Sequence, residues 1–108
     1  MITCYQIKYQ YNTMYFDNFK KCHLKIVDTF QYVSKNYKSG VFETYPLDEY
    51  STNFIMVNNN NIRLSISHPI DTDGELETII YEGDELNHDS LEYHENHEKL
   101  LEYIKELK

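Results

Sequence analysis

The sequence has few of the residues on which several large classes of protein depend. Its 108 residues include three glycines, two prolines and two cysteines, and neither alanine nor tryptophan occurs. Three scattered glycines do not form the loop that cradles a phosphate in nucleotide-binding motifs. No apolar run approaches the roughly 20 residues that a membrane-spanning helix needs. Nucleotide-loop enzymes and integral membrane proteins are therefore not predicted.

The two cysteines, Cys4 and Cys22, are too few for the disulfide framework of a small secreted domain. They also lack the C-x-x-C spacing of redox and zinc motifs. The first residues, MITCYQIKYQYN, do not have the charged start and apolar stretch of a secretory signal. We therefore expect two reduced thiols and a cytoplasmic location.

Basic residues are scarce, and arginine occurs once, at Arg63. The formal net charge of −8 is uneven: residues 1–40 contain six lysines and two acids, whereas residues 41–108 contain sixteen acids and four basic residues. The second part repels the phosphates of nucleic acid. A lysine-rich face within the first part does not outweigh this repulsion: Lys20, Lys21, Lys25, Lys35 and Lys38. We expect no direct binding of nucleic acid, and a protein partner with a basic surface is favoured.

The abundant residues predict a folded domain. Hydrophobic residues make up 41% of the chain and aromatic residues 15%, which is too much apolar surface for a disordered chain. A chain of this length holds one core, so we expect a single domain over residues 1–108. Residues 4–11 alternate between apolar and polar, as in a strand with one buried face. A helical apolar stripe then predicts a helix over residues 15–38, which Gly40 ends.

Four further strands are predicted, at residues 41–45, 54–57, 62–67 and 75–82. The asparagine run at residues 58–61 separates the second of these strands from the third, and asparagine accepts the positive φ of tight turns. A two-residue turn at Asn59-Asn60 sets a register in which Val57 faces Ile62 and Ile55 faces Leu64. That register buries four side chains on one face: Ile55, Val57, Ile62 and Leu64.

The last predicted helix begins with the pattern of a capping box, with Asp89 as the N-cap and Glu92 three residues later. Its glutamates lie opposite the apolar stripe, and Glu95 is expected to pair with Lys99 four residues on. The stripe consists of Tyr93, His97, Leu100, Ile104 and Leu107. The predicted order is β-α-β-β-β-β-α, an α+β fold in which an antiparallel sheet carries two helices packed on one face.

The sequence does not contain the pattern of a catalytic site. There is no G-x-S-x-G motif, and Cys22 and His23 are sequence neighbours, which does not orient a nucleophile and its base. The segment DTDGE resembles part of a calcium loop, but fitting Gly74 to the loop glycine puts Pro69 and Ile80 where the first and last ligands belong. We predict no catalytic residues, no cofactor and no enzyme activity.

Two histidines form a candidate metal pair. His94 and His97, three residues apart on the predicted helix, share one side of it, and His88 or Asp84 is available as a third ligand. The metalloprotease pattern H-E-x-x-H is absent, because the sequence here is H-E-N-H. We expect no metal site. A metal-dependent enzyme or sensor that uses His88, His94 and His97 is kept as an alternative.

Acidic residues support the main functional prediction. On the last predicted helix, carboxylates recur roughly 5–6 Å apart along the axis, a scale similar to that of phosphates on a nucleic-acid strand. Such a surface can occupy a groove built for phosphate. The predicted partner-binding residues are Glu75, Glu77, Glu82, Asp84, Glu85, Glu95, Glu98, Glu102 and Glu106, with Tyr81 and Tyr103 as anchors.

In its size, its acidity and its many tyrosines and asparagines, the chain resembles small inhibitors encoded by phages and mobile elements, such as anti-CRISPR and DNA-mimic proteins. The resemblance implies a stoichiometric binding protein that blocks a nucleic-acid-handling host enzyme. An alternative is an immunity-type or accessory protein that binds a basic partner independently of nucleic acid. Only the first hypothesis requires the partner's nucleic-acid site to be occupied.

Overall fold

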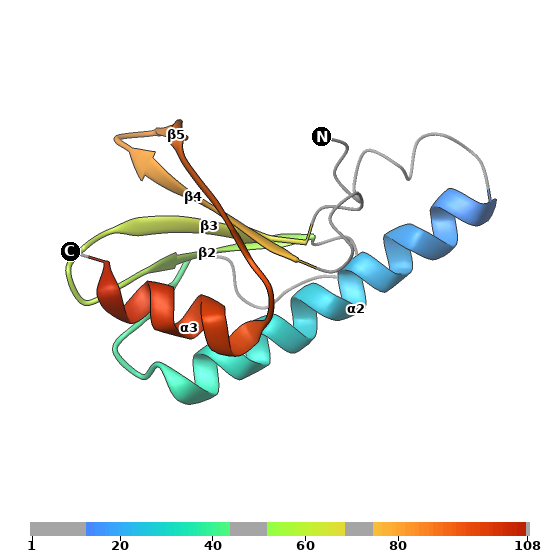
Figure 1. Cartoon of the computed structure of the whole chain (residues 1–108), viewed down its shortest axis with the longest axis horizontal. Coiled ribbons are helices and arrows are strands. Elements are labelled where there is room, and N and C mark those ends of the chain that lie inside the picture. The colour runs from blue at the N-terminus through green and yellow to red at the C-terminus, as the bar shows by residue number, and fades with distance from the viewer. Residues whose placement is uncertain (1–12, 44–51, 69–74, 108) are drawn as a thin grey trace.

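The described part of the chain forms one antiparallel sheet and two helices (Figure 1). The structure is a computed structural model that describes residues 13–43, 52–68 and 75–107, with side chains from residue 20 onward. In chain order the elements are α2 (Thr13–Asn36), β1 (Val41–Phe42), β2 (Asn53–Val57), β3 (Arg63–Ser67), β4 (Leu76–Glu82), β5 (Glu85–His94) and α3 (His97–Glu106). The predicted α+β class is confirmed. The order differs, because the first described element is a helix, and the strand predicted at residues 4–11 lies outside the described residues.

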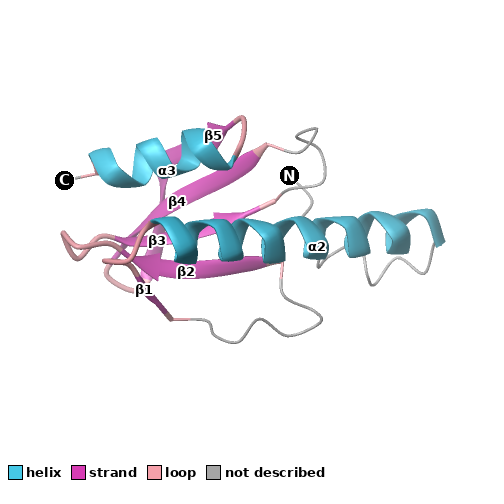
Figure 2. Cartoon of the chain, turned by 90° about the horizontal axis from the view of Figure 1, so that it is seen from below, coloured by secondary structure: helices cyan, strands magenta, loops and turns pink. Residues whose placement is uncertain are grey.

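Both helices pack on the same face of the sheet, in which the strands are neighbours in the order β1-β2-β3-β4-β5 (Figures 1 and 2). Three phenylalanine rings meet between α2 and the sheet, with centroid separations from 4.8 to 5.9 Å: Phe30, Phe42 and Phe54. Buried aromatic rings contribute much of the energy of a small core. Phe42 is partly buried and packs against the buried core cluster, which contains Phe30 and Phe54. Its other members are Ile26, Val33, Tyr37, Met56, Leu64, Ile66, Leu76, Leu100, Leu101 and Ile104.

Helix α2 forms where the apolar stripe predicts it. Ile26 and Val33 are fully buried, whereas the lysines of the opposite side are exposed. The chain then turns closely past β2 at Gly40. A Cβ atom at Gly40 would lie 3.0 Å from side-chain atoms of both Met56 and Tyr37, so a larger residue there would force these side chains to shift.

The hairpin of β2 and β3 forms at the predicted place but in another register. Met56 pairs with Leu64, where the prediction places Ile55. A slip of one residue turns a strand over, because its side chains alternate between the two faces. The prediction is therefore wrong for three core side chains, which are only half-buried: Ile55, Val57 and Ile62. Their places in the core are taken by Phe54, Met56 and Ile66.

The cause is a turn that is one residue longer than predicted. The backbone N–H of Asn58 donates to the carbonyl of Ile62, and that of Asn61 donates to the carbonyl of Asn58, both over 3.0 Å. Asn61 has a φ of 62°, the left-handed conformation that a three-residue hairpin loop needs at its last position. The side-chain oxygen of Asn58 accepts the N–H groups of Asn60 and Ile62, each over 2.9 Å, and so fixes the longer loop.

Residues 85–94 form strand β5, so the prediction of a helix that begins at Asp89 is wrong. A two-residue turn, Gly83-Asp84, joins β4 to β5, and Gly83 has a φ of 65°, as the tight turns of hairpins require. The pairing of β4 with β5 is interrupted by a bulge opposite the middle of β4. The hydroxyl of Ser90 stabilises the bulge, since it donates to the Asn87 carbonyl over 2.6 Å and accepts the Ile80 N–H over 2.8 Å.

Helix α3 begins after Asn96, whose side-chain oxygen accepts the N–H of Lys99 over 2.9 Å. Replacing Asn96 with alanine is expected to lower the free energy of unfolding by about 1 kcal/mol, because this cap is lost. Asp89→Ala, at the predicted cap, should change it by less than about 0.5 kcal/mol, because Asp89 is exposed on β5. Urea denaturation followed by circular dichroism measures both changes. A larger loss for Asp89→Ala would contradict the observed start of α3.

Cys22 is disulfide-bonded, so the predicted reduced thiol at this position is wrong. Cys4 and the calcium-loop fragment at residues 71–74 lie outside the described residues. In the described ranges, no helix is both long enough and apolar enough to cross a membrane. The cytoplasmic location stays a prediction.

Candidate functional site

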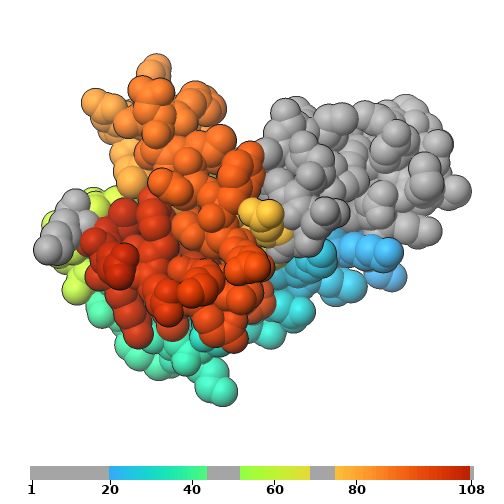
Figure 3. Space-filling view, in the orientation of Figure 1, coloured from blue at the N-terminus to red at the C-terminus, as the bar shows by residue number. Residues whose placement is uncertain are grey.

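Exposed carboxylates form a strip from the tip of the β4–β5 hairpin, along β5, to α3. We call this strip the acidic surface. Figure 3 shows β5, in orange, and α3, in red, side by side on one face of the molecule. The lysines of α3 are Lys99 and Lys105, so negative charge prevails along the strip. The acidic surface consists of Glu82, Asp84, Glu85, Asp89, Glu92, Glu95, Glu98, Glu102 and Glu106, all of them exposed.

Three of these carboxylates form a row on α3. Glu98, Glu102 and Glu106 follow one another at intervals of four residues, which corresponds to roughly 6 Å along the helix axis. The Lys99 ammonium lies 3.7 Å from Glu102, but an exposed pair of this kind contributes little to stability. Glu95 precedes the helix, so the predicted helical pair of Glu95 and Lys99 does not form.

Three predicted partner-binding residues lie apart from the strip: Glu75, Glu77 and Tyr81. Glu75 and Glu77 are half-buried at the start of β4. Tyr81 lies beneath Arg63, whose guanidinium carbon is 4.1 Å from the ring centroid. The Arg63 Nε also donates to Glu43 over 2.7 Å, and this hydrogen bond raises the pKa of Arg63. Tyr81 therefore holds an arginine of its own chain, and its role as a partner anchor stays a prediction.

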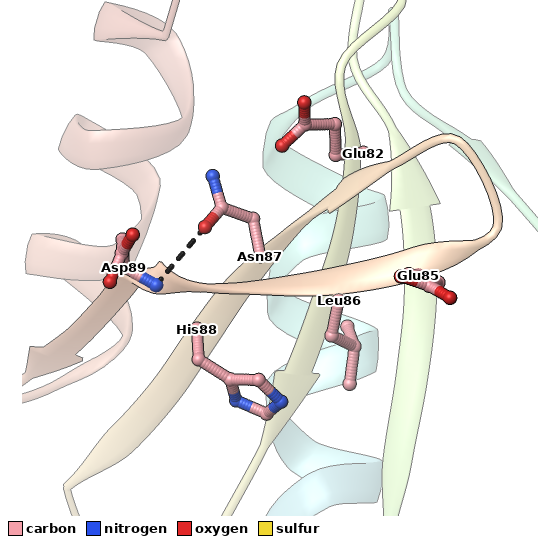
Figure 4. Close-up of a pocket in the computed structure, with 6 residues that line it drawn as sticks. All are labelled: Glu82, Glu85, Leu86, Asn87, His88 and Asp89. Carbon is pink, nitrogen blue, oxygen red and sulfur yellow. Dashed lines mark hydrogen bonds between the residues drawn. The ribbon is translucent and has the colours of Figure 1, made fainter.

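A hollow of about 460 Å³ lies beside the bulge of β5, with Leu86 and Asn87 among its lining residues (Figure 4). The backbone N–H of Asp89 donates to the Asn87 side-chain oxygen over 3.1 Å and shapes this bend. Figure 4 shows that the carboxylates of Glu82, Glu85 and Asp89 lie around the hollow and point in different directions. Because they do not converge, the hollow presents negative charge without the geometry of an acid–base pair.

A second hollow, of about 360 Å³, lies between the end of β5 and α3, and we call it the β5–α3 groove. The rings of His94 and Tyr103 lie against each other there, with centroids 4.5 Å apart. The His94 Nε2 is 2.8 Å from the hydroxyl of Thr78. Burial lowers the pKa of His94, against the smaller effect of Glu92, and burial raises the pKa of Tyr103. Both rings are therefore mainly uncharged at neutral pH. The groove is lined by Tyr93, His94, Glu95, Lys99, Glu102, Tyr103 and Glu106.

A buried threonine joins α2 to two histidines from other elements, an arrangement that we call the threonine–histidine junction. The Thr29 hydroxyl oxygen lies 2.7 Å from His97 Nε2 and 3.0 Å from His68 Nε2, and it donates to the Lys25 carbonyl over 2.9 Å. Because the single hydroxyl proton goes to that carbonyl, both imidazoles must donate to the hydroxyl oxygen. Burial, helped by nearby Lys25, lowers the pKa of His68 to about 4. An adjacent hollow of about 270 Å³ is lined by groups of both charges.

The three histidines of the metal hypothesis lie apart in the fold. His88 is exposed on β5, His94 contacts Thr78, and His97 contacts Thr29. The prediction that His94 and His97 share one side of a helix is wrong, because His94 ends β5 and His97 begins α3. Within residues 13–43, 52–68 and 75–107, no three histidine, cysteine, aspartate or glutamate residues are grouped so as to hold a metal ion.

Comparison of the chain with models of protein families, with curated proteins and with solved structures finds no match. The geometry of the acidic surface and of the β5–α3 groove is therefore the basis for a functional proposal.

Proposed function

We propose that this protein is a small acidic inhibitor that binds a nucleic-acid-handling enzyme and covers the basic surface on which that enzyme holds DNA or RNA. In this proposal the acidic surface takes the place of a phosphate backbone. The role is that of the anti-CRISPR and DNA-mimic proteins of phages and mobile elements, which the sequence resembles in size and acidity. The proposal involves no catalytic step and no cofactor.

The observation that supports the proposal most is the strip of exposed carboxylates along the hairpin, β5 and α3. Lysine and arginine side chains that neutralise phosphates attract carboxylates in the same way, and the same release of counterions favours the complex. The row on α3 is held in place, because Leu100, Leu101 and Ile104 bury the other side of that helix in the core. The backbone of this row is already ordered, so the conformational entropy lost on binding is mainly that of the side chains.

An immunity-type or accessory protein that binds a basic partner away from its nucleic-acid site is the second candidate. The observation that favours it is apolar exposure on β5, where Leu91 is 37% exposed and Tyr93 is 41% exposed. Apolar side chains among charged ones are typical of specific protein interfaces, and phosphate mimicry does not need them.

The test is a competition experiment. Proteins are captured from a bacterial lysate on the immobilised chain, and the retained enzyme is then purified. Its affinity for the chain should fall steeply with salt, and duplex DNA or RNA should displace the chain from it. A captured enzyme that binds its nucleic acid equally well in the complex would remove the inhibitor proposal and leave the second candidate.

Two sets of variants control this experiment. Neutralising the row on α3 with Glu98→Gln, Glu102→Gln and Glu106→Gln should weaken binding about tenfold, chiefly by slowing association, and should spare the fold. The matched control adds the same positive charge at exposed positions off the acidic surface: Gln31→Lys, Asn36→Lys and Asn53→Lys. It should leave the affinity nearly unchanged. Equal effects of the two sets would mean that net charge, and not the acidic surface, governs binding.

A further inference from the structure

The β5–α3 groove combines aromatic rings with carboxylates from the turn after β5 and from α3. Tyr103 is half-buried there and lies against the buried imidazole of His94. Glu95, from the turn between β5 and α3, lines the groove, and Glu102 and Glu106 line it from α3. An uncharged aromatic surface between carboxylates is suited to a flat cation.

The chain itself shows how such a cation is held. Its single arginine, Arg63, lies 4.1 Å over the ring of Tyr81 while its Nε donates to Glu43 over 2.7 Å. The planar guanidinium can stack on a ring and bind a carboxylate at the same time, which a lysine ammonium does less well. The β5–α3 groove offers the same two kinds of group, an aromatic ring and carboxylates. The basic side chain that lines it is a lysine, Lys99, whose ammonium lies 3.7 Å from Glu102.

We infer that the β5–α3 groove is the docking site for an arginine side chain of a basic partner protein. In this arrangement the guanidinium lies against Tyr103 and donates to Glu95 and to Glu106, which line the same groove. A second copy of this chain is a poor occupant, because its only arginine is held at Tyr81 and its acidic surface is repelled. The inference rests on the proposed function, which supplies a partner with a basic surface. It adds that the groove recognises an arginine side chain of that partner.

The test compares hexa-arginine with hexa-lysine, peptides of equal length and charge, by calorimetric titration of the full chain at fixed ionic strength. Hexa-arginine should bind about three- to tenfold more tightly. Tyr103→Leu should remove most of this preference and leave the affinity for hexa-lysine in place, whereas Tyr103→Phe, which keeps the ring, should retain it. Equal affinities for the unsubstituted chain, or an unchanged preference in Tyr103→Leu, would overturn the inference.

A second pair of variants decides the question if Tyr103→Leu does not fold. Glu95→Gln with Glu106→Gln should reduce the preference for hexa-arginine, whereas Glu82→Gln with Glu85→Gln, which removes the same charge from the hairpin, should not. Equal reductions would overturn the inference. Because the peptides replace the partner, the result is separable from the competition experiment. Failure here with successful nucleic-acid competition removes the arginine site alone, and the reverse outcome removes the inhibitor proposal alone.

Discussion

Replacement of Phe54 by alanine is expected to lower the free energy of unfolding by about 3–5 kcal/mol, the usual range for loss of a buried aromatic side chain. Phe54 is fully buried in β2, with ring centroids 5.3 Å from Phe30 and 5.9 Å from Phe42. Its removal leaves a cavity between α2 and the sheet that the surrounding core closes only in part. Urea denaturation should show a lower midpoint with an unchanged slope.

The matched control is Ile55→Ala at the neighbouring position. Ile55 is half-buried on the opposite face of β2, so we expect a loss of about 1 kcal/mol. The register predicted from the sequence reverses this order, since it buries Ile55 in place of Phe54. A larger loss for Ile55→Ala than for Phe54→Ala would therefore contradict the observed register. If Phe54→Ala does not fold, Phe54→Leu should lose less and preserve the comparison.

The predicted register of β2 and β3 differs from the observed one because the local sequence is compatible with both. Residues 54–57 are all apolar, so their pattern does not say which alternate pair faces the core. The run of four asparagines accommodates a two-residue or a three-residue loop, since any of them accepts a positive φ. Tertiary packing determines the register, because Phe54 packs against Phe30 and Phe42 in the core. The three-residue loop that ends at Asn61 is compatible with this register.

The sequence around β5 contains two conflicting patterns, one that predicts a hairpin and one that predicts the start of a helix. Gly83-Asp84 between two strand-like segments is the pattern of a two-residue hairpin. Asp89 and Glu92, before an apolar helical stripe, form the pattern of a capping box. Residues 85–87 and 92–94 pair with β4 and hold this segment as a strand, and Asn96 then supplies the cap. Helix α2 has no such conflict, because its apolar period continues over more than five turns.

The candidate site was predictable only where it depends on one element. Glu98, Glu102 and Glu106 lie on the exposed side of α3, as the helical period predicts. The β5–α3 groove depends on strand β5, so the sequence did not indicate Tyr93 as one of its lining residues. The contact of Tyr81 with Arg63 depends on the neighbouring strand β3, so a local pattern does not indicate it. The two histidines that contact Thr29, His68 and His97, lie 39 and 68 residues away in the sequence, so a local pattern does not predict these contacts.

The threonine–histidine junction predicts that the free energy of unfolding decreases as the pH is lowered from neutrality. Burial and then Lys25 lower the pKa of native His68 to about 4, whereas an unfolded histidine has a pKa of about 6.5. The unfolded state therefore takes up a proton at a pH where the native state does not, and stability falls through the interval between these values. The expected loss is at most about 2 kcal/mol between about pH 7.5 and about pH 5. His94, whose pKa burial also lowers, changes stability in the same direction.

Two histidine variants test whether the pH dependence of the free energy of unfolding comes from His68. Urea midpoints are measured at several pH values for the unsubstituted chain, for His68→Asn, and for His88→Asn at an exposed position of β5. The unsubstituted chain and His88→Asn should lose stability in parallel, whereas His68→Asn should lose less, whatever its stability at neutral pH. Ordinary carboxylates titrate mainly below this interval, and their protonation relieves repulsion in a chain of net charge −8. Their effect thus opposes the loss, so a decrease in this interval comes from buried imidazoles. The same slope in all three proteins would show that His68 is not held neutral beside Thr29.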